Sequence, residues 1–192
     1  NRLVLIAPKN SKLTTVKLIS QTGRRTTHID VDACTEKGIA VCAGGVGNSI
    51  TTAEHAITLM LALAREIPQA DASTQAGKWE KNRFMGVEIT GKTLGVIGCG
   101  NIGAIAADRA LGLKMKVVAF DPFLSPERAK DIGVEKVELD ELFKRADFIT
   151  LHTPLTEQTR NVISRDAIAR MKKGTRLINC ARGGLVDEAA LY

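Results

Sequence analysis

Aromatic residues are scarce in this sequence of 192 residues, which contains five Phe, one Trp and one Tyr. A nucleic-acid surface combines clustered basic residues with stacking aromatic rings. Residues 47–192 instead carry twenty Lys and Arg against eighteen Asp and Glu, with both signs interspersed. The net charge of +6 comes mainly from residues 1–46, which carry seven basic and three acidic residues. We therefore expect no nucleic-acid partner and favour small anions as ligands.

Long apolar runs and paired cysteines are also missing. The longest apolar stretch, residues 57–64, is interrupted by Thr58 and is far shorter than the roughly 18–20 residues of a membrane span. The four cysteines form no CxxC pair, so neither a metal site nor a disulfide framework is expected. Residues 1–7 lack the pattern of a signal peptide. These absences predict a cytoplasmic protein with no membrane partner, no metal and reduced cysteines. The missing initiator Met predicts a piece of a longer chain.

The remaining composition, 44% hydrophobic and 25% charged, is ordinary for a globular protein. Short apolar strands alternate with helical patterns, which predicts an α/β fold with a doubly wound parallel sheet. We expect two domains, separated near Gly44, Gly45 and Gly47. In residues 1–46 the expected strands are 3–7, 16–19 and 39–42. In residues 47–192 the expected strands are 94–97, 116–120, 147–151 and 175–180, and the expected helices are 102–111, 139–145 and 164–171.

A long helix is expected at residues 51–68, started by a capping box in which Thr51 and Glu54 satisfy each other's backbone donors. Its centre, residues 57–64, is apolar on nearly every face. Such a helix must be covered on all sides, by its own sheet and by a second subunit. We therefore expect a homodimer formed through the helix that starts near Thr51.

Residues 98–103 read Gly-Cys-Gly-Asn-Ile-Gly, a GxGxxG motif between a predicted strand and a predicted helix. In this context Gly98 allows a tight turn, Gly100 lets the backbone approach a pyrophosphate, and Gly103 lets the helix pack on the strand. Asp121 follows 18 residues after Gly103, where a carboxylate binds ribose hydroxyls and repels a 2′-phosphate. The motif predicts NAD rather than NADP; a glycine-rich turn without a ligand is the alternative.

Further candidates lie where later strands end. Arg182 follows the last predicted strand and precedes two glycines, so its guanidinium is expected at the carboxyl edge of the sheet, where it can bind a carboxylate or a carbonyl oxygen. Thr153 and Pro154 follow the strand before it and would wall the adenine side of the cofactor. A surface arginine and a simple strand-ending turn are the alternatives.

The three histidines are weak candidates for acid–base catalysis. His55 lies in the first turn of the long helix and is expected to be solvated or at an interface. His152 ends a strand and is expected to pack near the cofactor without taking protons. His28 and Asp30 could form an acid–base pair, but such spacing is common by chance.

These motifs together resemble the D-2-hydroxyacid dehydrogenases. The resemblance lies in residues 98–103, Asp121, the His-Thr-Pro of 152–154 and above all the Asn-Cys-Ala-Arg-Gly-Gly-Leu-Val-Asp-Glu of 179–188. Similarity to the phosphoglycerate dehydrogenase branch lies in residues 78–80, 84–86 and 94–98. The resemblance implies a Rossmann-like NAD-binding domain, residues 47–192, inserted into a smaller flavodoxin-like substrate-binding domain that includes residues 1–46. It also implies an active site in the cleft between them and dimerisation through the long helix.

The resemblance implies roles for individual residues as well. Cofactor contacts are implied for Asn101 and Ile102 (pyrophosphate), Asp121 (adenine ribose), Thr153 (adenine side), and Cys180, Ala181 and Arg182 (nicotinamide half). Arg182 would also bind the carboxylate and carbonyl of a small anionic hydroxy acid and polarise its C–O bond.

The implied reaction is the oxidation of 3-phospho-D-glycerate to 3-phosphohydroxypyruvate, a step of serine biosynthesis. The family's proton-shuttling Glu and His lie beyond the arginine motif, and we expect the chain, which stops at Tyr192, to be inactive in turnover. Arg24 and Arg25 stand where that branch has a glycine-rich substrate loop, and one hypothesis is that they bind a phosphate. Two alternatives stay open: another D-2-hydroxyacid dehydrogenase, such as a glyoxylate or hydroxypyruvate reductase, and a non-catalytic NADH-sensing corepressor of the same fold.

Overall fold

The computed structural model of the protein describes residues 16–21, 26, 29–44 and 48–192. The chain divides into two compact units, Asn1–Asn48 and Ser49–Tyr192. Outside the described residues lie the expected strand at 3–7 and Arg24, Arg25, His28, Gly45 and Gly47. The assignment of a substrate-binding and a cofactor-binding domain stays a prediction.

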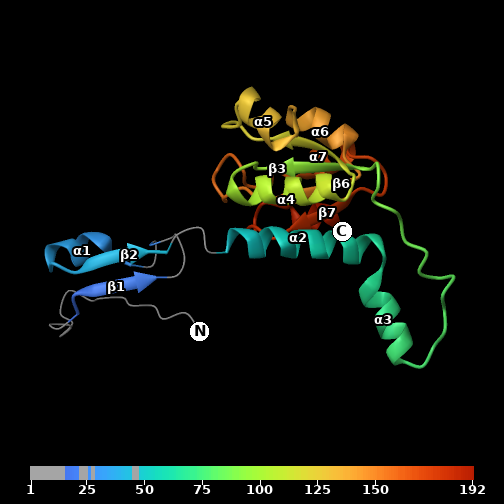
Figure 1. The fold of residues 1–192 in the computed structure, drawn as a ribbon, viewed down its shortest axis with the longest axis horizontal. Helices are drawn as coiled ribbons and strands as arrows, with labels where there is room; N and C mark the ends of the chain where they lie inside the picture. Colours follow the sequence, from blue (N-terminus) through green and yellow to red (C-terminus); the bar gives the residue numbers. More distant parts are fainter. Residues whose placement is uncertain (1–15, 22–25, 27–28, 45–47) are drawn as a thin grey trace. The chain divides into compact units, whose positions relative to one another are not determined.

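The first unit contains a small βαβ arrangement (Figure 1). Strands β1 (Leu18–Gln21) and β2 (Ala40–Ala43) pair in parallel. Helix α1 (Val31–Glu36) connects them and begins after Asp30, whose carboxylate accepts a hydrogen bond from the Ala33 N–H at 2.9 Å. Both strands lie one or two residues later than the sequence pattern indicates, and α1 is an additional element.

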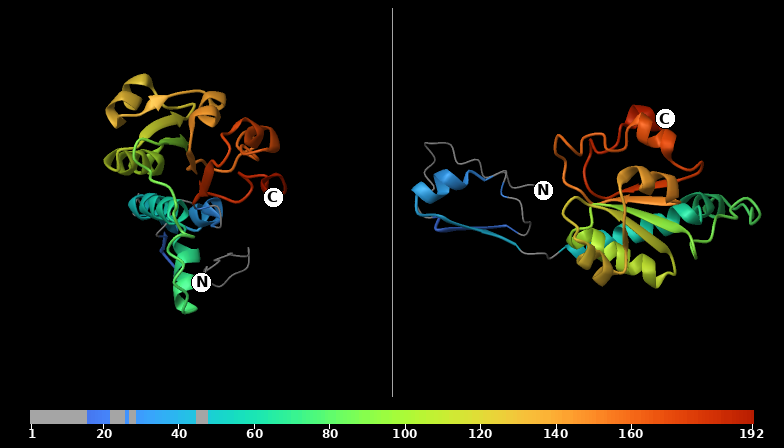
Figure 2. Two further views of the ribbon diagram at one scale, coloured as in Figure 1. Left: turned by 90° about the vertical axis from the view of Figure 1, so that its right-hand side faces the viewer. Right: turned by 90° about the horizontal axis from the view of Figure 1, so that it is seen from above.

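The second unit contains a five-stranded parallel sheet, which confirms the predicted α/β fold (Figures 1 and 2). Its strands are β3 (Thr93–Ile97), β4 (Lys116–Phe120), β5 (Glu135–Lys136), β6 (Phe148–Leu151) and β7 (Arg176–Asn179). Their spatial order is β5-β4-β3-β6-β7. Because β3 and β6 are neighbours in the sheet but not in the chain, a crevice is expected at their carboxyl ends. This switch point brings Gly98 next to His152.

Helices cover both faces of this sheet. The helices packed around the sheet are α2 (Ser49–Ala64), α4 (Asn101–Gly112), α5 (Pro126–Ile132), α6 (Leu139–Arg145), α7 (Arg165–Arg170) and α8 (Glu188–Leu191). On one face, Met60 of α2 packs in a core with Leu94 and Phe148 of the sheet. On the other face, Phe143 of α6 packs in a second core with Ile149. Burial on both faces explains why β3 and β6 are apolar almost throughout.

The long helix expected at residues 51–68 is in fact two helices. Because α2 begins at Ser49, Thr51 lies inside its first turn and cannot be the N-cap of the predicted capping box. The chain turns at Glu66, which has a left-handed backbone with φ 54°, and α3 (Ile67–Gln75) follows with Pro68 in its first turn. Proline is favoured there because the first N–H groups of a helix have no intrahelical acceptor. Pro68 therefore helps to start a helix instead of ending one.

The second unit covers only one side of α2. Its buried side is formed by Ala53, Ala56, Met60 and Ala64. Leu59, Leu61 and Leu63 remain 41%, 37% and 43% exposed, so the expected cover on all sides is not supplied by this sheet. Helix α3 and the loop after it extend away from the sheet and expose Trp79 and Met85 (Figures 1 and 2). Within the ranges that the structure describes, no helix is long and apolar enough to cross a membrane.

Candidate cofactor site

The glycine turn (residues 98–103) follows β3. At two of its glycines, neighbouring atoms lie so close that a side chain would not fit. Gly98 has φ +90°, and a Cβ there would lie 2.9 Å from backbone atoms of His152. A Cβ on Gly103 would lie 2.0 Å from the carbonyl oxygen of Gly98. Both positions therefore require glycine, and the first turn of α4 packs directly on the end of β3.

Gly100 differs from these two glycines because the fold leaves open space beside it. A Cβ there would meet no described atom within 4 Å, so the fold itself tolerates a side chain. Gly100 is also the N-cap of α4, and no side chain caps the first N–H groups of this helix. Open space in front of uncapped N–H groups suits a pyrophosphate. The geometry thus fits a dinucleotide, with Asn101 and Ile102 supplying helix N–H groups.

Asp121 follows β4, and backbone groups bind both of its carboxylate oxygens. Oδ2 accepts a hydrogen bond from the N–H of Cys99 and Oδ1 accepts one from the N–H of Phe123, each at 2.8 Å. These bonds fix the carboxylate beside the glycine turn and leave each oxygen able to accept a second hydrogen bond, as from a ribose hydroxyl. Sequence reasoning missed the Cys99 amide, although its place inside the motif was an available signal.

Cys99 itself is a structural residue rather than a reactive one. Its side chain is buried. This burial, with a smaller contribution from the Asp121 charge, raises the pKa of the Cys99 thiol to about 11. The thiol therefore stays neutral and unreactive at physiological pH.

The end of β6 borders the glycine turn. His152 Nε2 lies 3.0 Å from Thr150 Oγ1, and Nδ1 has no hydrogen-bond partner among the described residues. Burial lowers the pKa of His152 to about 4, so the ring is neutral at pH 7, in agreement with the expected packing role. Thr153 also borders the turn, because its Cγ2 would lie 2.9 Å from a Cβ on Gly98. Its contact with the adenine side of the cofactor stays a prediction.

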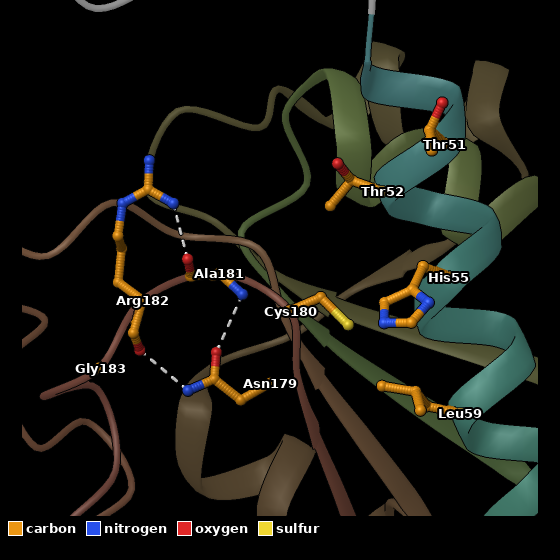
Figure 3. A pocket seen from close by; sticks show the side chains of 9 residues that line it. All are labelled: Thr51, Thr52, His55, Leu59, Asn179, Cys180, Ala181, Arg182 and Gly183. Carbon is orange, nitrogen blue, oxygen red and sulfur yellow. Dashed lines mark hydrogen bonds between the residues drawn. The ribbon is translucent and has the colours of Figure 1, made fainter. Parts of the chain in front are cut away.

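The arginine loop (residues 179–184) begins at the last residue of β7 and lines a cavity of about 530 Å³ (Figure 3). The loop residues on this wall are Asn179, Cys180, Ala181, Arg182 and Gly183. Arg182 Nη1 donates a hydrogen bond to the Ala181 carbonyl at 2.6 Å, and the remaining guanidinium N–H groups can bind an anion. Burial raises the pKa of the Cys180 thiol above its usual range. The three residues expected at the nicotinamide half thus lie on one wall.

The opposite wall of the cavity comes from α2, which sequence reasoning did not assign to the site. It is formed by Thr51, Thr52, His55 and Leu59 (Figure 3). The helical spacing of these residues places them on one side of α2, but it carries no information about what that side faces. His55, expected at a solvated or interface position, is exposed and lies across from Cys180 in this cavity.

Both parts of the site follow one edge of the sheet. β6 pairs in parallel with β3 on one side and with β7 on the other. The glycine turn, Thr153 and the arginine loop therefore follow three adjacent strand ends, where open α/β sheets bind their ligands. No group of His, Cys, Asp or Glu in the described part of the chain is placed to hold a metal ion.

Comparison with known proteins establishes the family. The sequence model of the D-isomer specific 2-hydroxyacid dehydrogenase, NAD binding domain, matches residues 57–192. The chain therefore belongs to this family, and the predicted cofactor, NAD, is confirmed at the level of the domain. The open space at Gly100 before the uncapped start of α4 and the Asp121 carboxylate beside the turn fit that cofactor.

Individual relatives agree with this assignment. A D-3-phosphoglycerate dehydrogenase of Archaeoglobus fulgidus is 50% identical over 189 residues, which are 98% of this chain and 35% of the relative. One of Methanocaldococcus jannaschii is 52% identical over 178 residues, which are 92% and 34% of the two chains. The apo D-lactate dehydrogenase of Escherichia coli matches in structure with a TM-score of 0.83 at 36% identity, over 92% of this chain and 55% of that one. An Aquifex aeolicus D-lactate dehydrogenase with NAD and lactic acid has a TM-score of 0.77 at 36% identity, over 92% and 53%. The chain spans about a third of these curated relatives and about half of these solved chains.

Proposed function

We propose that the protein takes part in the NAD-dependent oxidation of a D-2-hydroxy acid, and that this acid is 3-phospho-D-glycerate. The observation that carries the reaction class is the placement of the glycine turn, Asp121 and Arg182 along one sheet edge. The substrate is supported by relatives named D-3-phosphoglycerate dehydrogenase at 50% and 52% identity. The similar D-lactate dehydrogenase structures, at 36% identity, favour a different D-2-hydroxy acid as the second candidate.

Each part of the edge has a separate role in this proposal. The N–H groups at the start of α4 bind the pyrophosphate, and the Asp121 carboxylate accepts hydrogen bonds from the adenine ribose. NAD, when bound, would supply the acceptor for the hydride that leaves C2 of the acid. Arg182 binds the acid's carboxylate and stabilises the negative charge that develops on the C2 oxygen.

The oxidation also releases the hydroxyl proton, which needs a base. His152 is a poor proton acceptor at pH 7, because burial lowers its pKa to about 4. We therefore expect the 192-residue chain to bind NAD without sustained turnover. Steady reduction of NAD by this chain would contradict that expectation and point to His55, which lines the cavity across from Cys180.

Gly100→Ala tests the cofactor site with little damage to the fold. The added Cβ meets nothing in the free protein but takes the space proposed for the pyrophosphate. We expect NAD affinity, measured by titration calorimetry, to fall roughly tenfold or more, about 1.4 kcal/mol. Gly112→Ala is the matched control, because it adds the same atom at the far end of α4, also in open space. Equal NAD affinity in the two variants would remove the pyrophosphate from this turn.

The substrate is tested by binding of acids to the NAD-loaded chain. We expect 3-phospho-D-glycerate to bind more tightly than D-lactate, and Arg182→Ala to weaken both because they share the carboxylate. Tighter binding of D-lactate would favour the second candidate. Binding of both acids that is unchanged in Arg182→Ala would exclude this arginine as the carboxylate ligand.

The homodimer and the cytoplasmic location also belong to this proposal. The dimer is supported by the exposed Leu61 and Leu63 on α2 and by the exposed Trp79 beyond α3. Sedimentation equilibrium should give a dimer, and Leu61→Asp with Leu63→Asp should give a monomer; a monomeric parent would contradict the proposal.

The cytoplasmic location is supported by all four cysteines being free, as in a reducing compartment.

A further inference from the structure

We propose that Asn179 is the positioning residue of Arg182, because its side-chain amide holds the two peptide groups that carry the arginine. The inference rests on the proposed role of Arg182 in binding the carboxylate of the substrate. Asn179 does not touch the substrate in this proposal. It acts through the backbone of the arginine loop.

The Asn179 side chain bridges the loop at two points. Its Oδ1 accepts a hydrogen bond from the Ala181 N–H at 3.0 Å, and its Nδ2 donates one to the Arg182 carbonyl at 2.9 Å (Figure 3). Both ends of the amide are used, so only one orientation of the amide satisfies both bonds. The Asn179 backbone is itself fixed in the sheet, where it pairs with Leu151 of β6. The amide therefore connects a rigid strand end to the segment that carries Arg182.

Few other hydrogen bonds restrain the loop backbone at this point, and the Ala181 side chain packs against the second core. The next anchor along the chain is the Gly184 carbonyl, which accepts a hydrogen bond from the Asn161 N–H at 2.9 Å. In the described part of the chain, no group outside the loop hydrogen-bonds to the peptide groups of Ala181 and Arg182. A Cβ on Gly183 would meet no described atom within 4 Å, so this residue contributes no side-chain packing.

The Arg182 guanidinium makes few interactions that would fix its direction. Its hydrogen bond goes to the neighbouring Ala181 carbonyl, and no carboxylate of the described residues forms an ion pair with Arg182. The direction of this long side chain therefore depends on the backbone that Asn179 holds. Donors that are already in place need no reorganisation when the anion binds, which is how positioning contributes to electrostatic catalysis.

Asn179→Ala tests the restraint directly. In the parent, the backbone ¹⁵N order parameters of Ala181 and Arg182 should be those of rigid backbone, about 0.85, and in Asn179→Ala they should fall below about 0.6. Asn179→Asp keeps an acceptor for the Ala181 N–H and should restore part of the order at Ala181. Asn82→Ala is the matched control, because Asn82 is an exposed residue of the loop after α3. Order parameters that stay at the parent values in Asn179→Ala would overturn the proposal.

The consequence for binding is measured with oxamate, which presents a carboxylate next to a carbonyl oxygen, on the NADH-loaded chain. We expect Asn179→Ala to weaken oxamate binding roughly five- to twentyfold, the range for one or two lost hydrogen bonds. Binding of ADP-ribose, which reaches only the glycine turn and Asp121, should stay within about twofold, since these lie on other strands. Equal losses for both ligands would indicate general damage and overturn the proposal, as would unchanged oxamate binding. Oxamate binding that is absent in the parent or unchanged in Arg182→Ala would instead refute the proposed role of Arg182, while the order parameters still decide the role of Asn179.

Discussion

The glycine turn and the arginine loop follow strands of the same sheet, but they are held in different ways. In the glycine turn, Gly98 and Gly103 approach their neighbours so closely that no side chain fits. In the arginine loop, a Cβ at Gly183 would meet nothing, and the Asn179 side chain restrains the backbone with two hydrogen bonds. Backbone packing thus fixes the part proposed to bind the invariant pyrophosphate. Side-chain hydrogen bonds fix the part proposed to meet the substrate, and such bonds are easier to change without unfolding the sheet.

The largest effect is expected for Gly103→Ala. The new Cβ would lie 2.0 Å from the Gly98 carbonyl oxygen, so α4 must move away from β3. We expect the free energy of unfolding to fall by about 3 kcal/mol or more, beyond ordinary overpacking, and NAD binding to be lost. Urea denaturation and titration calorimetry measure the two changes. Gly183→Ala, the same substitution in the arginine loop, should leave the free energy of unfolding within about 0.5 kcal/mol. Similar stabilities of the two variants would show that the turn is not closely packed.

The next effect concerns His152, which directly follows β6, the strand between β3 and β7. Burial lowers its pKa in the folded chain to about 4, whereas an unfolded histidine titrates near 6.5. Above pH 6.5 both states are neutral, and the residue adds no pH dependence. As the pH falls from 6.5 to 4, only the unfolded chain takes up the proton, so the free energy of unfolding decreases by up to about 3 kcal/mol.

Urea denaturation at pH 7.5 and pH 4.5 measures this loss. His152→Gln should lose less stability than the parent between the two pH values, because it has no proton to take up in that range. His55→Gln is the control and should keep the difference, since its side chain is exposed. The assignment fails if the parent and His152→Gln lose equal stability on acidification.

A smaller effect, confined to binding, is expected for Asp121→Ala. Hydrogen bonds from the Cys99 and Phe123 N–H groups hold the carboxylate in place before the cofactor binds. The substitution therefore removes an acceptor for the ribose hydroxyls that is already oriented. NAD affinity should fall roughly 10- to 100-fold, about 1.4–2.8 kcal/mol, and the preference for NAD over NADP should shrink because the negative charge is gone. Calorimetric titration with both cofactors measures this. Asp108→Ala, an exposed acid on α4, is the control. Unchanged selectivity in Asp121→Ala would remove this residue from the ribose site.

The sequence predicted the glycine turn better than the cavity wall, for a physical reason. The residues of the turn are contiguous, and their spacing alone specifies strand, turn and helix. Thr51, Thr52 and His55 reach the arginine loop only because α2 packs against β7, far along the chain. No local pattern encodes that contact. The residue spacing on α2 shows that these residues share one side of the helix, but it does not show which element packs against that side.

The same reasoning applies to the fold. β4 and α6 have the predicted bounds because their patterns are clear. β5 was missed because it consists of two exposed charged residues, Glu135 and Lys136, paired through their backbone alone. The division of the long helix was missed because Glu66 adopts the left-handed region without being glycine, and Pro68 is equally compatible with the end and the start of a helix.

The smallest effect tests whether the two loops bind different halves of one cofactor. Cys180 is half-buried in the cavity wall, whereas Cys42 of the first unit is exposed. NAD should slow alkylation of Cys180 several-fold and leave that of Cys42 unchanged, as followed by mass spectrometry of the labelled peptides. ADP-ribose lacks the nicotinamide, which is the group expected to cover the Cys180 thiol. It should therefore not protect Cys180 from alkylation. Equal protection by both ligands would mean that filling the glycine turn alone changes the arginine loop, and the two loops would then be one mechanical unit rather than two separately held ones.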